Sequence, residues 1–291
     1  MPNVMNAMNV HHLTPHIGAE ISGLDLSRDI DASTIDEVLH VLDTRGVVIM
    51  RGQQLTLENF MAFSRRLGPL DVHPLRKFSR PGFPELMINS NIIEDGQPIG
   101  LADAGRHWHT DGAYLQTPYR ITVLYGVEIP VKDGAPLGDT YFTSTSAAYD
   151  ALEPELRQRL SSLHGINVHG VGRKKFSATP LDLGAELSQK IQSGIEHPVV
   201  RTHPFTGRKC IYVNPGCTSQ IAGMSESESE ALLQQLYEHT VRPEFVYRHQ
   251  WQVGDFVMWD NCSTQHRAVG DYDLPLRRLL YRTIVKGTPV Q

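Results

Sequence analysis

The segment FVYRHQWQVGDFVMW, Phe245 to Trp259, holds two short apolar and aromatic runs, Phe245–Trp251 and Asp255–Trp259, separated by Gln-Val-Gly. Short runs of this composition that are bounded by turn residues are typical of buried strands. A similar run, Leu279–Lys286, closes the chain. Further upstream, Val199–His203 and Lys209–Val213 flank PFTG at Pro204–Gly207, a pattern that predicts a hairpin.

Helical signals are fewer. Ile35, Val38, Leu39 and Leu42 recur at helical spacing between a cap at Ser33 or Thr34 and a stop at Gly46. We expect further helices from about Thr56 to Leu67, from Ser146 to Leu163, and from Ser225, which opens a capping box. Many short strands with a few outer helices predict a mainly β fold with a double-stranded β-helix core, that is, a cupin-like jelly roll. We expect residues 1–291 to form a single domain, with helical insertions around 146–163 and 225–240.

Composition narrows the class of protein. The chain has 291 residues, 27 of them basic and 32 acidic, with a net charge of −5. Nucleic-acid binders usually have a basic excess, which is missing here. No apolar run approaches the roughly 18 residues of a membrane span, and the N-terminal sequence does not resemble a signal peptide, so we expect a cytoplasmic protein. The three cysteines lack zinc-type spacing and are expected to be small buried hydrophobes.

The heptapeptide RHWHTDG, Arg106 to Gly112, contains the most informative polar pattern. If it is a strand, His109 and Asp111 point to the same face. An imidazole and a carboxylate together supply two of the three ligands of a facial metal site. His266, at the end of WDNCSTQH, is the candidate for the third. Two His and one carboxylate with open coordination positions are the ligand set of non-heme Fe(II) oxygenases.

Two arginines near the C-terminus add a second element. In LRRLLYR, Arg278 and Arg282 share one face of an expected strand, and Arg277 points the other way. Arginines that face a largely apolar interior are costly unless they meet anions, and a guanidinium binds a carboxylate through two parallel hydrogen bonds. A dicarboxylate that reached from the metal to Arg278 would satisfy this requirement.

Several motifs together resemble the taurine dioxygenase and 2,4-dichlorophenoxyacetate dioxygenase family of Fe(II)- and 2-oxoglutarate-dependent oxygenases. They are WHTD at Trp108–Asp111, LGDT at Leu137–Thr140, HPVVRTHP at His197–Pro204 and WDNCSTQH at Trp259–His266. The resemblance covers most of the chain. It implies Fe(II) as the metal and 2-oxoglutarate and O₂ as co-substrates.

The resemblance also implies roles for individual residues. His109, Asp111 and His266 match the iron ligands, and Thr140 and Arg278 match the residues that bind 2-oxoglutarate. Arg282 matches a second arginine that lines the active site. Compared with the family members that it resembles, this chain has one extra residue near Asp273, between His266 and the arginines. Arg277 is therefore an alternative to Arg278 as the residue that binds 2-oxoglutarate.

The same likeness suggests an oxygenase that hydroxylates, and in some cases thereby fragments, a small anionic substrate such as a sulfonate or a substituted carboxylate. The products from the co-substrate would be succinate and CO₂. His73, Arg76 and Phe176 are the candidate substrate-binding residues. We expect a homo-oligomer without a nucleic-acid or membrane partner. The alternatives are a Zn-dependent hydrolase that uses the same three ligands and a non-catalytic cupin-like binding protein. A hydrolase would have no need for an arginine that holds a distal carboxylate.

Overall fold

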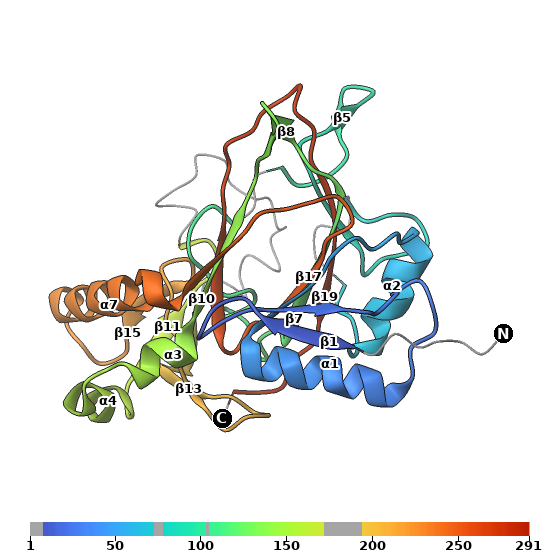
Figure 1. Cartoon of the computed structure of the whole chain (residues 1–291). Coiled ribbons are helices and arrows are strands. Elements are labelled where there is room, and N and C mark those ends of the chain that lie inside the picture. The colour runs from blue at the N-terminus through green and yellow to red at the C-terminus, as the bar shows by residue number, and fades with distance from the viewer. Residues whose placement is uncertain (1–7, 73–77, 103–104, 172–193, 291) are drawn as a thin grey trace.

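The computed structural model describes residues 8–72, 78–102, 105–171 and 194–290 (Figure 1). Its largest element is a seven-stranded sheet in the order β1-β2-β3-β17-β7-β19-β4. In chain order these strands are β1 Asn9–His12, β2 Ala19–Ser22, β3 Val47–Met50, β4 Met87–Ser90, β7 Ile121–Glu128, β17 Phe256–Asp260 and β19 Leu279–Val285. A three-stranded sheet contains β16 (Val246–His249), β10 (Thr140–Ser144) and β18 (Thr264–Ala268). The mainly β fold with outer helices, built on a jelly-roll core, is confirmed.

Residues of the central strands alternate between two apolar layers, as the period of two in a strand requires. Val47 and Ile49 of β3 pack with Trp259 of β17 and Phe142 of β10 in the cluster between the two sheets. The intervening residues of β3 and β17, among them Met50 and Met258, join a second cluster on the outer face of the large sheet. Burial of both faces explains why these strands have continuous rather than alternating hydrophobic sequences.

Two helices cover that outer face. They are α1 (Ala32–Arg45) and α2 (Leu57–Arg66), both beside the large sheet in Figure 1. The helix expected from about Thr56 is α2, and Thr56 is its N-cap, but the side chain that caps α1 belongs to Asp31, which accepts a hydrogen bond from the main-chain N–H of Thr34. The expected cap at Ser33 or Thr34 is therefore wrong by two or three residues, because three capping residue types stand within four positions, 31–34, and the Asp31 carboxylate is the one that accepts.

A second group of elements packs beside the small sheet. It consists of α3 (Thr145–Asp150), α4 (Pro154–Leu160), α7 (Glu226–Thr240), the 3-10 helix η2 (Pro243–Phe245), β11 (His164–Asn167), β12 (Ile195–Pro198), β15 (Thr218–Ile221), β13 (Val200–Thr202) and β14 (Lys209–Ile211). The expected hairpin is the antiparallel pair β13 and β14, and the Ser225 capping box opens α7. The expected continuous helix over 146–163 is two helices, because Pro154 begins the second one and disfavours a helical residue before it. Two short hairpins complete the fold: β5 (Ile93–Glu94) with β6 (Gln97–Pro98), and β8 (Val131–Lys132) with β9 (Ala135–Pro136).

The turn between β17 and β18 is fastened by the buried carboxylate of Asp260. Its Oδ2 accepts hydrogen bonds from the main-chain N–H and the hydroxyl of Ser263, and it lies 3.2 Å from His203 Nε2. Burial by itself would raise the pKa of Asp260, but His203 and Ser263 outweigh it and hold this pKa below its ordinary value. This turn leads directly into the strand that carries His266.

The lowered pKa of Asp260 predicts a defined pH dependence of folding. A carboxyl with a lower pKa in the folded than in the unfolded state stabilises the fold above its unfolded pKa, about 4, and loses that contribution as the pH falls further. Asp260→Asn should therefore lower the free energy of unfolding by about 2 kcal/mol at pH 7 and by clearly less at pH 3. Urea denaturation of both proteins at several pH values measures this, and a pH-independent difference would contradict it.

Within the described ranges, no helix combines the length and apolarity that crossing a membrane requires. All three cysteines are buried and none forms a disulfide, as the sequence predicts.

Candidate metal centre

The main chains of His109 and His266 form an isolated antiparallel bridge. The N–H of His109 donates to the carbonyl of His266 at 3.0 Å, and the N–H of His266 donates to the carbonyl of His109 at 2.9 Å. His266 also pairs with Phe142 of β10, so the small sheet fixes its position. The two imidazole centroids lie 4.1 Å apart. Two residues far apart in sequence thus present their side chains side by side.

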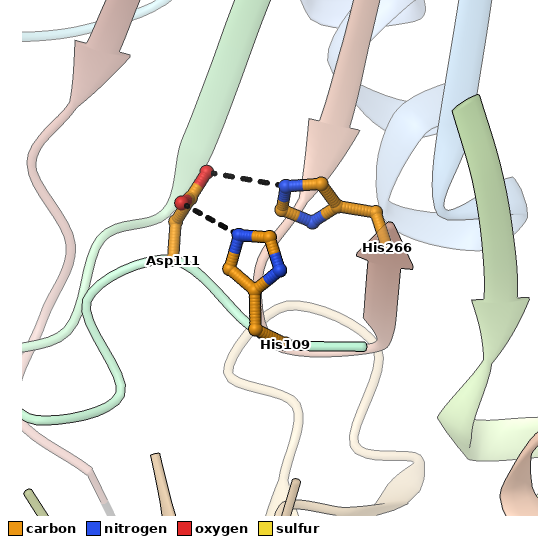
Figure 2. Close-up of side chains that lie close together, drawn as sticks. All are labelled: His109, Asp111 and His266. Atoms are coloured by element: carbon orange, nitrogen blue, oxygen red, sulfur yellow. Dashed lines mark ion pairs between the residues drawn. The ribbon is translucent and has the colours of Figure 1, made fainter. Parts of the chain in front are cut away.

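Asp111 does not share a strand with His109. Only His109 forms a β-bridge, and Asp111 begins a turn, so the period-of-two argument for their common face is wrong. The carboxylate still faces both imidazoles: Oδ1 lies 3.6 Å from His109 Nε2, and Oδ2 lies 3.8 Å from His266 Nε2 (Figure 2). Its position is set by the large sheet. The hydroxyl of Thr122 on β7 donates to Oδ2 at 2.8 Å, and Arg282 Nη2 on β19 lies 2.7 Å from the same oxygen.

The electrostatics of the cluster favour the protonation states that metal ligands require. Burial would raise the pKa of Asp111, but Arg282 and the two imidazoles outweigh it and hold this pKa well below its ordinary value. Burial, reinforced by neighbouring His109, lowers the pKa of His266 well below its ordinary value. At neutral pH, Asp111 is therefore ionised and His266 is neutral, so both can donate a lone pair.

The geometry fits a small divalent cation. One ligand atom from each of His109, Asp111 and His266 can be chosen so that all three lie within 4.8 Å of one another. His109 Nδ1 lies 2.9 Å from the carbonyl of His107, so it is the nitrogen that carries the proton and donates, which leaves the Nε2 lone pair available. Two imidazoles and one carboxylate match the donor set of a non-heme ferrous ion.

Gly216 packs directly against His109. A Cβ added at residue 216 would lie 2.5 Å from His109 Cβ and 3.1 Å from the carbonyl oxygen of Trp108. Gly216→Ala should therefore displace His109 and weaken metal binding by about tenfold, the lower end of the loss seen when support of a ligand is removed.

Titration of the metal-free protein with Mn(II) measures this effect. Gly165→Ala is the control, because its added Cβ would meet the side chains of Val213 and Thr218 rather than a candidate ligand. Equal metal affinities for the two variants would contradict the packing argument.

His109, Asp111 and His266 line a cavity that also contains an unusual arginine. Arg278 is only 7% exposed, yet among the described residues no carboxylate pairs with it. Its Nη2 donates to the Gly138 carbonyl at 3.1 Å and its Nη1 to the Tyr272 hydroxyl at 3.4 Å, whereas its buried Nε has no partner among these residues. Arg277, by contrast, is half exposed and pairs with Glu128 at 3.0 Å. Burial of a guanidinium without a counter-charge is costly, which favours an anionic ligand at Arg278.

Thr140 and Arg282 line this cavity together with Arg278 and the His-Asp-His cluster. Thr140 is buried on β10, and its hydroxyl accepts a 3.0 Å hydrogen bond from Trp251 Nε1, so its own proton is free to be donated elsewhere. The extra residue near Asp273 lies in the loop before β19 and leaves Arg278 rather than Arg277 at the cavity.

Not every predicted site residue can be placed. His73, Arg76 and Phe176 lie outside the described residues. Three further residues near the site were not predicted from the sequence. Thr122 contacts Asp111, Asn261 contacts Thr122, and Tyr272 contacts Arg278. Asn261 lies inside the WDNCSTQH motif, so its position was a usable signal, whereas nothing in the sequence around Thr122 or Tyr272 distinguishes them from their neighbours.

A jelly roll that holds two His and one carboxylate in the same cavity as a buried arginine, for which the described residues supply no carboxylate partner, defines the class of Fe(II)- and 2-oxoglutarate-dependent oxygenases. The sequence agrees: residues 9–284 match the model of the family described as "Taurine catabolism dioxygenase TauD, TfdA family". The chain belongs to this family. It is a 2-oxoglutarate-dependent dioxygenase, an oxidoreductase that uses Fe(II), 2-oxoglutarate and O₂.

Individual relatives cover nearly the whole chain. Pentalenolactone F synthase of Streptomyces arenae is 33% identical over 278 residues, which are 92% of this chain and 91% of that protein. The alpha-ketoglutarate-dependent 2,4-dichlorophenoxyacetate dioxygenase of Cupriavidus pinatubonensis is 33% identical over 281 residues, 93% and 94% of the two chains. The crystal structure of a taurine dioxygenase from Burkholderia xenovorans superposes with a TM-score of 0.79 at 34% identity and covers 96% of this chain and 91% of that one.

Proposed function

We propose that His109, Asp111 and His266 bind the Fe(II) ion and that Thr140 and Arg278 bind 2-oxoglutarate. The observation that carries this assignment is the buried guanidinium of Arg278, which has no carboxylate partner in the described chain and lines the same cavity as the three ligands. The distal carboxylate of 2-oxoglutarate supplies the missing charge, and the hydroxyl of Thr140 donates to it. Bidentate pairing of this kind fixes both the position and the orientation of a co-substrate.

The bound ferrous ion supplies the activation of O₂, with oxidative decarboxylation of 2-oxoglutarate to succinate and CO₂ coupled to hydroxylation of a substrate C–H bond. The protein contributes orientation and exclusion of water. Trp259 and Leu124 supply apolar walls to the cavity, and Arg278 holds the far end of the co-substrate away from the reacting carbon. Where the hydroxylated carbon bears a heteroatom leaving group, the product breaks down to a carbonyl compound and the released acid, amine or phenol.

The substrate we propose is a small organic anion, a sulfonate or a substituted carboxylate. Among the described residues, Arg106, Arg278 and Arg282 line the cavity, and Asp111 is the carboxylate that lines it with them. Guanidinium groups that face a cavity create a positive local potential, which favours an anionic substrate over a neutral one. The named relatives act on different compounds, and both a carboxylate and a sulfonate occur among them.

Succinate release with a panel of paired compounds tests this proposal. Each pair contains a sulfonate, an aryloxyacetate or another carboxylate together with its neutral amide or ester. We expect at least one anion to stimulate succinate release well above the substrate-free rate, and its neutral partner to stimulate it much less. Equal stimulation by the neutral partners would refute the anionic substrate class while leaving the iron and 2-oxoglutarate assignments in place.

A further inference from the structure

The two oxygens of the Asp111 carboxylate have different surroundings. Oδ2 accepts a hydrogen bond from the Thr122 hydroxyl at 2.8 Å and lies 2.7 Å from Arg282 Nη2, so a donor and a cation already face it. Oδ1 lies 3.6 Å from His109 Nε2, beyond hydrogen-bond distance. The carboxylate therefore offers Oδ1, rather than Oδ2, to a metal between the imidazoles.

The Thr122 hydroxyl can keep Oδ2 occupied only while its single proton points at Asp111. Asn261 enforces this direction, because its Nδ2 donates to Thr122 Oγ1 at 3.0 Å. An amide nitrogen cannot accept a hydrogen bond, so the Thr122 proton has no alternative partner on that side. Thr122 and Asn261 are fully buried, which keeps water from substituting for either group.

Main-chain hydrogen bonds fix Asn261 and Thr122 relative to each other. Thr122 pairs with Trp259 across β7 and β17, and the main-chain N–H of Asn261 donates to the carbonyl of Arg120 at 2.8 Å. The segment after β17 thus carries Asn261 and then, five residues later, His266. One short stretch of chain supplies a candidate ligand and also supports the group that orients another.

We propose that Asn261 is a positioning residue that acts through Thr122 to hold Asp111 with Oδ1 toward the metal. This inference rests on the proposed ligand role of Asp111. Residues that orient metal ligands in this way typically change metal affinity by about 10- to 100-fold when they are replaced.

The test is a double-mutant cycle that measures Mn(II) affinity of the otherwise intact, metal-free protein. Asn261→Leu and Thr122→Val each remove one polar contact at nearly constant volume, and each should weaken Mn(II) binding by about tenfold or more. Because Asn261 acts only through Thr122, the double variant should bind no more weakly than Thr122→Val alone. Effects that multiply in the double variant, or affinities that stay at the wild-type level, would overturn the proposal.

Controls separate this role from general destabilisation. Thr122→Ser keeps the hydroxyl and should retain wild-type affinity, so a loss as large as that of Thr122→Val would also overturn the proposal. Thr283→Val removes another buried hydroxyl, which donates to Ser64 Oγ at 3.0 Å, and should lower thermal stability without weakening Mn(II) binding. If Asn261→Leu does not fold, Asn261→Ala replaces it in the cycle.

The outcome is distinguishable from a failure of the ligand assignment. If Asp111→Ala abolishes Mn(II) binding and Asn261→Leu leaves it unchanged, only the positioning role of Asn261 is refuted. If Asp111→Ala itself binds Mn(II) normally, the assignment of the metal ligands is refuted as well.

Discussion

Arg278→Ala should raise the KM for 2-oxoglutarate by about 30-fold or more, whereas Arg277→Ala should change it by less than about threefold. Loss of one partner of a buried, hydrogen-bonded charge pair costs about 2 to 5 kcal/mol, and each 1.4 kcal/mol corresponds to a factor of ten. Arg277 is half exposed and pairs with Glu128, an arrangement worth about 1 kcal/mol at most.

Arg278→Ala should leave the stability of the protein without co-substrate nearly unchanged or increase it. The buried guanidinium has no counter-charge among the described residues, so its removal relieves a desolvation cost. Initial-rate kinetics over a range of 2-oxoglutarate concentrations, together with thermal unfolding, measure both effects. If Arg277→Ala produced the larger rise in KM, the distal-carboxylate role would move to Arg277.

Asp111→Ala should have the second large effect and abolish measurable Fe(II) binding at micromolar concentrations. The substitution removes the only anionic ligand of the cluster, so it should weaken binding by more than the roughly 10- to 100-fold typical of outer-shell residues. It also leaves Arg282 without the carboxylate that lies 2.7 Å from it, which should lower stability.

Metal binding must be separated from this loss of stability. Asp255→Asn is the matched control, because Asp255 is a buried carboxylate with its own imidazole partner, His249, 3.1 Å away and outside the cavity. It should lose stability and keep its Fe(II) affinity. Anaerobic titration of each protein with Fe(II), followed by the absorption that appears when 2-oxoglutarate is added, measures both; an undiminished signal in Asp111→Ala would contradict the ligand assignment.

Local sequence rules predicted much of the fold because local physics decides it. Local signals located α2, the capping box at Ser225 located the start of α7, and short apolar and aromatic runs located β17 and β19. The errors occurred where neighbouring residues compete. Asp31 outcompeted Ser33 and Thr34 as the cap of α1, and Pro154 divided the expected helix over 146–163.

The contacts that bring the three candidate ligands together could not be predicted from the sequence. The convergence of His109, Asp111 and His266 was expected, but from the assumption that the first two share a strand. In the structure the main-chain bridge to His266 and the contacts of Thr122 and Arg282 with Asp111 produce it instead. Contacts of this kind depend on the register between distant strands, which no local pattern encodes.

The choice between Arg277 and Arg278 could be predicted from the sequence. Counting alternate residues favoured Arg278 over Arg277, and the structure places Arg278 at the cavity and Arg277 at the surface, although Arg278 lies just before β19. Its main chain is fixed there by two hydrogen bonds, one from its N–H to Asn91 and one from Ser90 to its carbonyl.

An anaerobic crystal structure with Mn(II) and 2-oxoglutarate, in which anomalous diffraction locates the metal, tests the assignment of the three ligands and of Arg278 together. We predict one peak bound by Nε2 of His109, Nε2 of His266 and the carboxylate of Asp111, with the distal carboxylate of 2-oxoglutarate on Arg278. A metal bound elsewhere, or a co-substrate whose distal carboxylate does not contact Arg278, would contradict it.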